Sequence, residues 1–324
     1  MDRKKINISF FDLIVNYLRY LRRLRNFTKI KTFLTYRRIY LNYISVIIFV
    51  STEKYPIKAI LRNGTRVVLR NYLEVQVFDG RHKGFECDIP NDSVTLPKRS
   101  FGNENMITIY GGVSNGDMKG IFIDNIYQKL PVKNKTVIDI GANIADSAIY
   151  FALRGASKII CLEPFPKNYE IAKKNIKLNN LSNTSIILAG CSDRRGEITI
   201  DVDSDYKSGI LFIMKDSKSG VKIPLLTLED ILNENNCDSD GSIILKMDCE
   251  GCEYESILSA NKNTLQRFSH ILIEYHRGYK DLKGKLQRSG FKVSTTRPKL
   301  NSRFRDLDGQ KLKFAVGYIY AERI

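Results

Sequence analysis

The sequence has no apolar stretch long enough to cross a bilayer. In the N-terminal segment the longest run without a charged residue, 39–52, is 14 residues long, whereas a membrane-spanning helix needs about 20 apolar residues. A secretory leader is not expected either, because the apolar stretch comes late and no small-residue cleavage site follows it. The six cysteines have no framework spacing, and a chain of 324 residues needs no disulfides to hold a core. We therefore expect a protein of the reducing cytoplasm.

Acidic residues are scarce in the first 70 residues. This segment holds sixteen Lys and Arg against Asp2, Asp12 and Glu53, so it carries +13 of the total net charge of +17. A contact with a polyanion or an anionic membrane therefore belongs to this segment, and nucleic acid is not an expected partner of the remaining chain. In residues 10–27 apolar side chains recur at helical spacing among arginines, which is compatible with peripheral contact with an anionic membrane. A solvated helix that packs on its own protein is the interpretation we favour.

Composition divides the chain into three parts. Residues 1–55 are a basic helical segment, residues 56–130 a small β-rich cap, and residues 131–324 a larger module. Two alternating runs, 57–61 and 66–69, flank Asn63-Gly64, the pair that a two-residue type I′ hairpin prefers. Beyond them we expect short strands and loops over 71–118 and a helix over 122–130.

From residue 136 onward, short apolar runs alternate with helical stretches, which is typical of a parallel sheet built from βαβ units. The predicted strands are 137–140, 158–162, 185–188, 243–247, 271–274, 291–294 and 314–320. The predicted helices are 146–154, 166–179, 228–235, 254–259 and 279–289. The pattern predicts an α/β fold in which a seven-stranded, mostly parallel sheet has helices on both faces. The last two strands form an antiparallel pair, and the N-terminal parts form a small α+β extension.

The first strand leads through Asp139 into Gly141, Ala142 and Asn143, and a helix follows directly. Gly141 lets the backbone turn tightly and approach a ligand at the carboxyl ends of the strands, where open α/β sheets bind. Asp139 can receive the ammonium group of a methionine moiety, directly or through water. The dinucleotide fingerprint is absent, because no second or third glycine is in place. We expect Asp146 to cap the helix.

The second strand ends at Glu163-Pro164, where a carboxylate can accept hydrogen bonds from both ribose hydroxyls of a nucleotide. Such a carboxylate serves NAD as well as S-adenosylmethionine, but a diphosphate needs a glycine-rich helix start, which this chain lacks. After the third strand comes Ser192-Asp193, where Asp193 either accepts from an adenine amino group or is a simple turn residue. The combination favours S-adenosylmethionine. The insert over 196–224 is expected to add strands over the cofactor edge.

The fourth strand leads to three acids, Asp248, Glu250 and Glu253, and the fifth to His276. Repulsion between neighbouring carboxylates would raise the pKa of at least one of them towards the range of a general base. The structural alternative is that Glu250 and Glu253 occupy the first turn of a helix, whose dipole favours acids. A neutral His276 imidazole could also take a hydroxyl proton.

Two further readings of these residues concern metals and sulfur. Asp248, Glu250 and His276 could gather a divalent cation, but our assignment contains no metal. Cys249 and Cys252 form a CxxC pair, yet a zinc site would need two more ligands and the sequence has no second pair. We interpret both cysteines as packing residues.

Five motifs together resemble the FkbM family of methyltransferases. They are DIGANI at 139–144, EPFP at 163–166, SD at 192–193, PLLTLED at 224–230 and KMDCEGCE at 246–253. The resemblance implies the class I (Rossmann-like) methyltransferase fold, S-adenosylmethionine as methyl donor, and O-methylation of a hydroxyl. Two departures are visible: Ala145 stands where the family usually has glycine, and Cys249 and Cys252 replace small apolar residues.

The sequence thus predicts a methyltransferase that acts on a hydroxyl of a sugar, glycan or secondary metabolite. Asp248 or His276 would be the base, and Glu250 and Glu253 would orient the acceptor. Asp139, Gly141, Ala142, Asn143, Glu163, Pro164, Ser192, Asp193 and Asp248 would bind the cofactor. The alternatives are a nicotinamide-dependent dehydrogenase, and an idle module that docks to a membrane or nucleic acid through its basic N-terminus.

Overall fold

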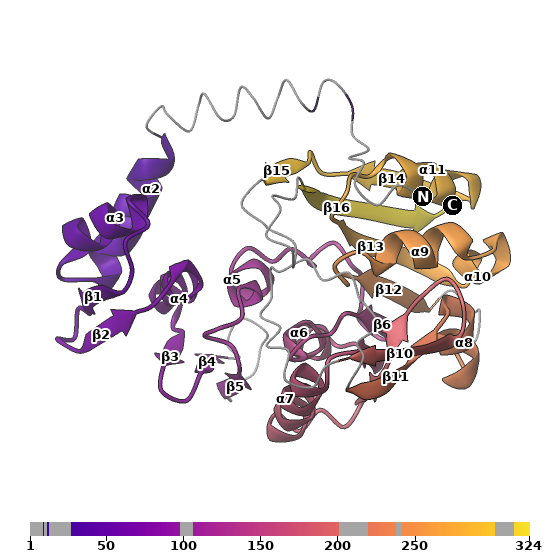
Figure 1. The fold of residues 1–324 in the computed structure, drawn as a ribbon, viewed down its shortest axis with the longest axis horizontal. Helices are drawn as coiled ribbons and strands as arrows, with labels where there is room; N and C mark the ends of the chain where they lie inside the picture. Colours follow the sequence, from indigo (N-terminus) through magenta and orange to yellow (C-terminus); the bar gives the residue numbers. More distant parts are fainter. Residues whose placement is uncertain are drawn as a thin grey trace. The chain divides into compact units, whose positions relative to one another are not determined.

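The computed structural model describes residues 9, 12, 27–97, 106–200, 220–237, 242–301 and 314–324. Contacts divide the chain into two compact units (Figure 1). We call Leu18–Ile126 the N-terminal unit, and Tyr127–Ile324 with Met1–Tyr17 the sheet unit. Asp12 is tied to the sheet unit because it accepts a hydrogen bond from the Tyr279 hydroxyl (2.8 Å). The expected boundaries at residues 55 and 130 stay predictions.

Seven strands of the sheet unit form one sheet in the order β14-β16-β13-β12-β6-β7-β8. They are β6 (Thr136–Ile140), β7 (Lys158–Glu163), β8 (Thr184–Leu188), β12 (Ile243–Met247), β13 (Phe268–Tyr275), β14 (Phe291–Thr295) and β16 (Phe314–Arg323). Strand β16 runs antiparallel to both of its neighbours, and the other pairs are parallel. The short β15 (Lys299–Asn301) also pairs with β16. The predicted seven-stranded, mostly parallel sheet with its antiparallel end is confirmed.

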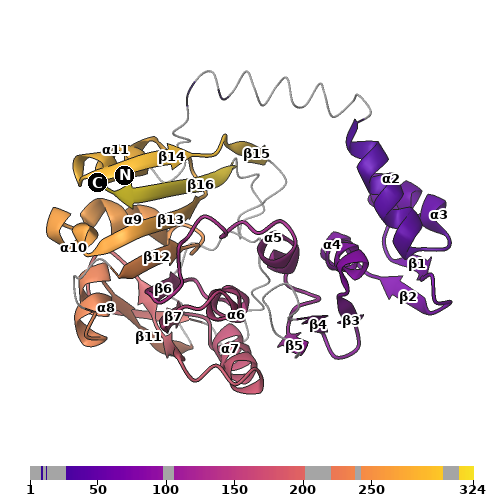
Figure 2. The ribbon, with the colours of Figure 1, turned by 180° about the vertical axis from the view of Figure 1, so that it is seen from behind.

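The helices that connect these strands cover both faces of the sheet (Figure 2). Helices α6 (Asp146–Leu153) and α7 (Pro166–Leu178) follow β6 and β7, whereas α9 (Cys252–Ser259) and α11 (Lys280–Arg288) follow β12 and β13. After β6 the chain continues through β7 to β8 at one edge of the sheet, and after β12 it continues through β13 towards the other edge. Because both sets of crossovers are right-handed, α6 and α7 lie on one face and α9 and α11 on the other. The order reverses between β6 and β12. This is the point at which open α/β sheets bind ligands.

A second, three-stranded sheet lies outside this arrangement. It has the order β10-β11-β9, formed by β9 (Gly190–Cys191), β10 (Gly196–Ile200) and β11 (Val221–Leu226). The expected extra strands of the 196–224 insert are therefore present at both of its ends, and residues 201–219 lie outside the described part. Helix α8 (Leu228–Glu234) begins with a capping box between Thr227 and Asp230. Helix α10 (Lys262–Gln266) was not predicted, because five residues are too few to show a helical period.

The N-terminal unit begins with two helices and a hairpin that share one core. Helices α2 (Phe27–Ile39) and α3 (Tyr43–Ser51) pack with β1 (Ile57–Ile60) and β2 (Arg66–Leu69) around Tyr40, Val46 and Leu69. The predicted hairpin is present, but its turn is not the two-residue type I′. Leu61 donates its N–H to the Thr65 carbonyl (2.8 Å) around a longer loop. In the Asn63-Gly64 pair only Gly64 has a positive φ (85°), whereas a type I′ turn requires two.

The rest of this unit contains one more small sheet and three short helices. Its elements are α4 (Tyr72–Phe78), the 3-10 helix η1 (Asp79–Lys83), β3 (Glu86–Asp88), β4 (Ser93–Pro97), β5 (Met106–Tyr110) and α5 (Asp117–Phe122). Helix α4 was expected as loop, yet Asn71 caps it by accepting from the Glu74 N–H (3.0 Å). The predicted helix over 122–130 is wrong. The helix ends at Phe122, and Asn125 adopts a left-handed φ of 51° within the turns that follow.

Within the described ranges, no helix is both long enough and apolar enough to span a bilayer. The amphipathic helix expected over 10–27 lies outside the described residues except for Asp12 and Phe27.

Candidate active site

A sharp turn at Gly141 brings together the loops after β6 and β12. Gly141 has φ 74° and donates its N–H to the Leu162 carbonyl of β7 (3.0 Å). A Cβ atom on Gly141 would lie 1.9 Å from the carbonyl oxygen of Asp248. The glycine is therefore required by the close approach of the protein's own backbone, and any side chain would push the Asp248 loop away.

The start of α6 departs from the expected capping. Ala145, in the position where the family usually has glycine, adopts a left-handed φ of 65° and is the N-cap residue. Asp146 is the first helical residue, and its Oδ1 accepts the N–H of Ser147 (2.8 Å). Its carboxylate therefore binds an N–H of the first turn, as expected of a capping residue, although Asp146 lies one residue after the N-cap. Ala142 is buried and Asn143 also has a positive φ (48°), so this loop makes several left-handed turns with one glycine.

Asp139 forms a buried ion pair with Lys246, which lies beside it on β12. The Lys246 Nζ lies 2.9 Å from Asp139 Oδ1, and the two side chains are 2 % and 0 % exposed. Asp139 Oδ2 accepts from the Ser147 hydroxyl (2.6 Å), and Lys246 also donates to the Gly141 carbonyl (2.9 Å). Burial alone would lower the pKa of Lys246, but the carboxylates of Asp139 and Asp248 raise it above the usual value. Asp139 thus holds the glycine turn through Lys246, and its contact with a cofactor ammonium stays a prediction.

Sequence reasoning assigned no role to Lys246, although a signal was present. A lysine in the middle of a strand whose other residues are Ile, Leu and Met must be buried with an opposite charge. Asp139 is the acidic residue of the neighbouring strand β6 and pairs with Lys246 in the strand register.

Glu163 lies at the carboxyl end of β7 and fixes the loop that follows β6. Its Oε2 accepts the N–H of Asn143 (2.8 Å) and its Oε1 the N–H of Phe165 (3.1 Å). Burial raises the pKa of Glu163 to about 7, against the lowering effect of these hydrogen bonds. Pro164 next to it is half-buried. Glu163 is therefore positioned at the strand end at which ribose hydroxyls bind in this fold class.

Ser192 and Asp193 follow β9 and touch each other. The Ser192 hydroxyl donates to Asp193 Oδ1 (3.2 Å), Ser192 is buried and Asp193 is exposed. Their expected contact with the adenine ring stays a prediction.

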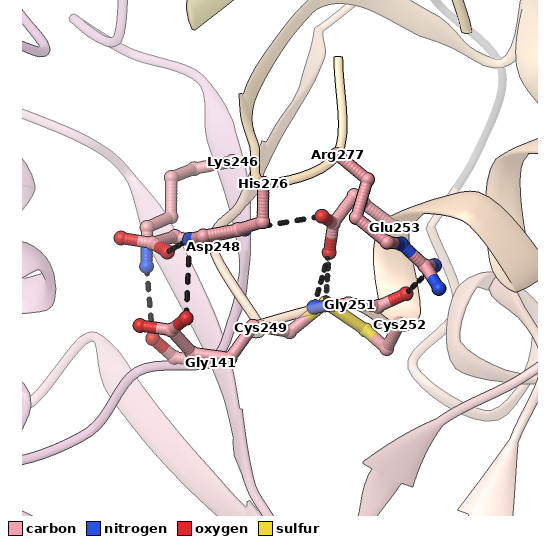
Figure 3. Close-up of a disulfide and its surroundings, with 10 residues drawn as sticks. Gly141, Lys246, Asp248, Cys249, Gly251, Cys252, Glu253, His276 and Arg277 are labelled. Atoms are coloured by element: carbon pink, nitrogen blue, oxygen red, sulfur yellow. Dashed lines mark hydrogen bonds and ion pairs between the residues drawn. A yellow bond between two sulfur atoms is a disulfide. The ribbon is translucent and has the colours of Figure 1, made fainter. Parts of the chain in front are cut away.

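The three acids after β12 gather around His276, as Figure 3 shows in part. His276 Nε2 lies 3.2 Å from Glu250 Oε2 and 3.8 Å from Asp248 Oδ1, and its Nδ1 lies 3.1 Å from Glu253 Oε1. Glu253 is fully buried, whereas the side chains of Asp248 and Glu250 are 19 % and 30 % exposed. Asp248 and Glu250 can thus reach a ligand, and Glu253 cannot.

The surroundings of His276 favour an imidazolium rather than the neutral ring expected from the sequence. Burial alone would lower the pKa of His276, but the carboxylates of Glu250 and Glu253 raise it well above its usual value. An imidazolium carries a proton on both ring nitrogens, which here lie beside Glu253 and Glu250, so the ring has no lone pair with which to accept another proton. As a base, Asp248 is the better placed group.

Two residues that sequence reasoning did not select hold this cluster in place. Tyr254 accepts the N–H of Arg277 (2.7 Å) and donates to the Gly278 carbonyl (2.7 Å). The Arg277 guanidinium stacks over the Tyr254 ring at 4.3 Å and donates to the Gly251 carbonyl (3.3 Å). These contacts join the end of β13, which carries His276, to the start of α9, which carries Glu253.

Asp248, Glu250 and His276 also offer donor atoms within 4.8 Å of one another, close enough for one divalent cation. A histidine must be neutral to bind a metal. The paired carboxylates on His276 therefore oppose that use, although the donor set itself is of a suitable kind.

Cys249 and Cys252 are joined by a disulfide at the start of α9 (Figure 3). Their Cα atoms are 5.5 Å apart, and Cys249 Sγ lies 3.6 Å from Glu253 Oε2. The interpretation of the pair as mere packing residues is wrong, because the bond closes a ring around Glu250 and Gly251. Cys87, Cys161 and Cys191 are free thiols.

The strand order, with its reversal between β6 and β12 and the antiparallel β16 inserted beside β13, defines the class I methyltransferase fold. The acids at the strand ends lie at the edge where that fold binds its ligands. Residues 139–293 match the family model of the methyltransferase FkbM domain. The predicted resemblance to the FkbM family is confirmed, because this match covers most of the sheet unit.

Individual relatives are distant. The chain is 24% identical to methyltransferase sdnD of Sordaria araneosa, over 48% of this chain and 72% of that protein. It is 30% identical to the uncharacterized protein 158B of Sulfolobus islandicus rod-shaped virus 1, over 46% of this chain and 66% of that protein. The crystal structure of methyltransferase FkbM from Methylobacillus flagellatus KT matches with 15% identity and a TM-score of 0.40, over 60% of this chain and 45% of that one. The chain therefore spans less than half of the length of that structure.

S-adenosylmethionine is the cofactor of this domain. The residues present fit it, because Glu163 presents a buried carboxylate at the end of β7. Glu163 would hold the ribose hydroxyls, and the loop of Gly141, Ala142 and Asn143 would lie against the remainder. No diphosphate-binding glycine series is present.

Proposed function

We propose that the chain is an O-methyltransferase that acts on a hydroxyl of a sugar, glycan or secondary metabolite. One observation carries the proposal: two partly exposed carboxylates, Asp248 and Glu250, lie at the ends of the strands, 3.8 Å and 3.2 Å from His276 Nε2. Carboxylates of this kind bind and deprotonate hydroxyl groups, which are the acceptors of O-methylation.

The cofactor supplies an electrophilic methyl group on a sulfonium centre. Asp248 accepts the proton of the acceptor hydroxyl, because of the three carboxylates it lies farthest from the His276 ring. Glu250 orients the acceptor through its own hydrogen bond. Glu253 and His276 position Glu250, and most of the rate enhancement comes from holding the acceptor in line.

A substitution series tests the assignment of the base. Asp248→Asn keeps the shape of the side chain but cannot accept the proton, so we expect turnover to fall by about 10²- to 10⁴-fold. His276→Gln should lower turnover less, because an amide still donates to Glu250. Glu255→Gln changes an exposed acid in the first turn of α9 and is the matched control. Full turnover by Asp248→Asn would remove Asp248 from the mechanism.

The acceptor is found by incubating the full chain with labelled S-adenosylmethionine and a host-cell extract, followed by mass identification of the methylated product. A methylated amine or carbon atom, or a methylated nucleic acid, would overturn the proposal of hydroxyl acceptors. Methyl transfer of any kind excludes an idle module. Titration calorimetry with S-adenosylhomocysteine and with NAD separates a methyltransferase from a dehydrogenase, since only the former binds the first ligand.

We further propose that the chain works in the cytoplasm. The support is the cysteine pattern of the sequence, which lacks the spacing of a disulfide framework. Fractionation of host cells tests this location, and recovery from a secreted fraction would contradict it.

A further inference from the structure

Helix α3 is apolar on nearly every side, yet Val46 is its only buried residue. Its sequence, YISVIIFVS, contains no charged residue. A helix that is apolar all round normally lies inside a protein core or a membrane. The outer face of α3 therefore has the composition of a buried surface while it faces solvent.

Neighbouring residues extend this face into a patch. Ile44 and Ile48 are one helical turn apart, and the Phe33 ring of α2 packs edge-on against Tyr43 at the start of α3 (5.3 Å). The exposed large apolar side chains are Phe33 39%, Leu34 49%, Leu41 47%, Ile44 57%, Ile48 54% and Phe49 41%. We call these six residues the α2–α3 patch. A contiguous apolar patch with polar surroundings marks a binding surface.

The surroundings of the patch are strongly basic. Arg37 and Arg38 are exposed on α2, one turn after Phe33 and Leu34 on the same face. Residues 27–70 contain nine Lys and Arg against a single acid, Glu53. The partner must therefore offer both apolar and anionic groups.

A basic cavity of about 350 Å³ opens in the same unit. Its lining includes the side chains of Arg38, Arg62 and Arg81, together with His82. Arginine forks match phosphate oxygens better than any other side chain does. Because Arg38 belongs both to the cavity and to the exposed face of α2, the cavity lies close to the patch.

We propose that the α2–α3 patch docks onto the surface of an anionic phospholipid bilayer. The apolar side chains enter the boundary between headgroups and acyl chains, and the cavity at Arg38 takes a phosphate headgroup. A second copy of the chain would bring like charges together and is disfavoured. Nucleic acid would match the arginines but would leave the isoleucines in water. The proposal does not rest on the proposed acceptor or base.

Vesicle sedimentation with the full chain tests the proposal. Vesicles of phosphatidylcholine with roughly 30 mol% phosphatidylserine should bind it, and vesicles of phosphatidylcholine alone should bind it less. Ile44→Asp with Ile48→Asp should weaken binding at least about tenfold, because two charges would have to enter the apolar boundary. Leu178→Asp is the matched control: Leu178 is equally exposed (46%) but lies on α7 of the sheet unit.

Charge reversal of Arg37 and Arg38 to Glu separates the electrostatic part. It should abolish the preference for phosphatidylserine and leave the weak binding to neutral vesicles unchanged. Circular dichroism melting of each variant verifies that it is folded.

Three outcomes would overturn the proposal. The first is the absence of binding to anionic vesicles by the unchanged chain. The second is equal binding by the doubly substituted isoleucine variant, which would assign the contact to another segment such as 10–27. The third is the absence of vesicle binding together with one of two other results: an oligomer that the isoleucine variant disperses, or binding of inorganic phosphate at the cavity. Those results would assign the patch to a second copy and the cavity to a soluble anion.

Discussion

Replacing Lys246 by Met should lower the free energy of unfolding of the sheet unit far more than the loss of a surface charge would. The Lys246 Nζ lies 2.9 Å from Asp139, and both side chains are almost completely buried. Removal of one partner of such a pair leaves a buried charge without compensation and costs about 3–5 kcal/mol. The same change also removes the hydrogen bond to the Gly141 carbonyl, so affinity for S-adenosylhomocysteine should fall as well.

A double-substitution cycle separates the charge from the packing. Lys246→Met combined with Asp139→Asn removes both charges, and more than half of the lost free energy of unfolding should return. Lys222→Met is the control, since its partner Glu197 is 3.4 Å away and both side chains are exposed, so we expect little change. Urea unfolding followed by circular dichroism measures the unchanged chain, the two single variants Lys246→Met and Asp139→Asn, the double variant and the control.

Two results would refute this reasoning. A loss smaller than about 1 kcal/mol for Lys246→Met would show that water or relaxation compensates Asp139. A double variant as unstable as the single one would show that the methylene stem of Lys246, and not its charge, stabilises the sheet.

Three further predictions follow from the site. Gly141→Ala should abolish cofactor binding in calorimetry, because its Cβ would lie 1.9 Å from the Asp248 carbonyl oxygen. The control Gly196→Ala, whose Cβ would have no atom within 4 Å, should bind the cofactor normally. Equal binding by both variants would contradict the requirement for glycine at the turn. Burial raises the pKa of Glu163 to about 7, and ribose hydroxyls donate hydrogen bonds to its charged form. Affinity for S-adenosylhomocysteine should therefore rise between pH 6 and pH 8. This rise should be absent in Glu163→Gln. Finally, Cys249 and Cys252 should resist alkylation in denaturant until a reductant is added; immediate labelling would show that the pair is reduced.

The centre of the sheet was predictable because β6, β7 and β12 are buried on both faces. Such strands read as continuous apolar runs, and β12 was located to the residue at 243–247. Strand β13 is longer than the predicted 271–274, because Ser269 and His270 interrupt its apolar run. His270 pairs with Ile244 of β12, and Ser269 is the extra residue at which the register shifts. Short elements such as α4 and α10 depend on capping by Asn71 and Asn261, which no periodic pattern reveals.

The sequence predicted which residues lie together at the site, but not the direction in which the pKa of His276 is shifted. Asp248, Glu250 and His276 were expected at the same rim and do lie together. The pKa of His276 is raised by Glu250 and Glu253. Glu253 lies 23 residues earlier and meets the ring only once α9 has packed beside β13. The disulfide was missed because spacing alone does not state whether a CxxC pair is oxidised.

The buried pair on β6 and β12 has a consequence for folding as well as for stability. Asp139 and Lys246 are aligned as register partners in neighbouring parallel strands whose other residues are nearly all apolar and interchangeable. Any slip of one strand along the other would leave two opposite charges in the core, each facing hydrocarbon. The pair therefore makes one alignment of the two central strands far more stable than every shifted one, and it is this alignment that brings Gly141 level with Asp248.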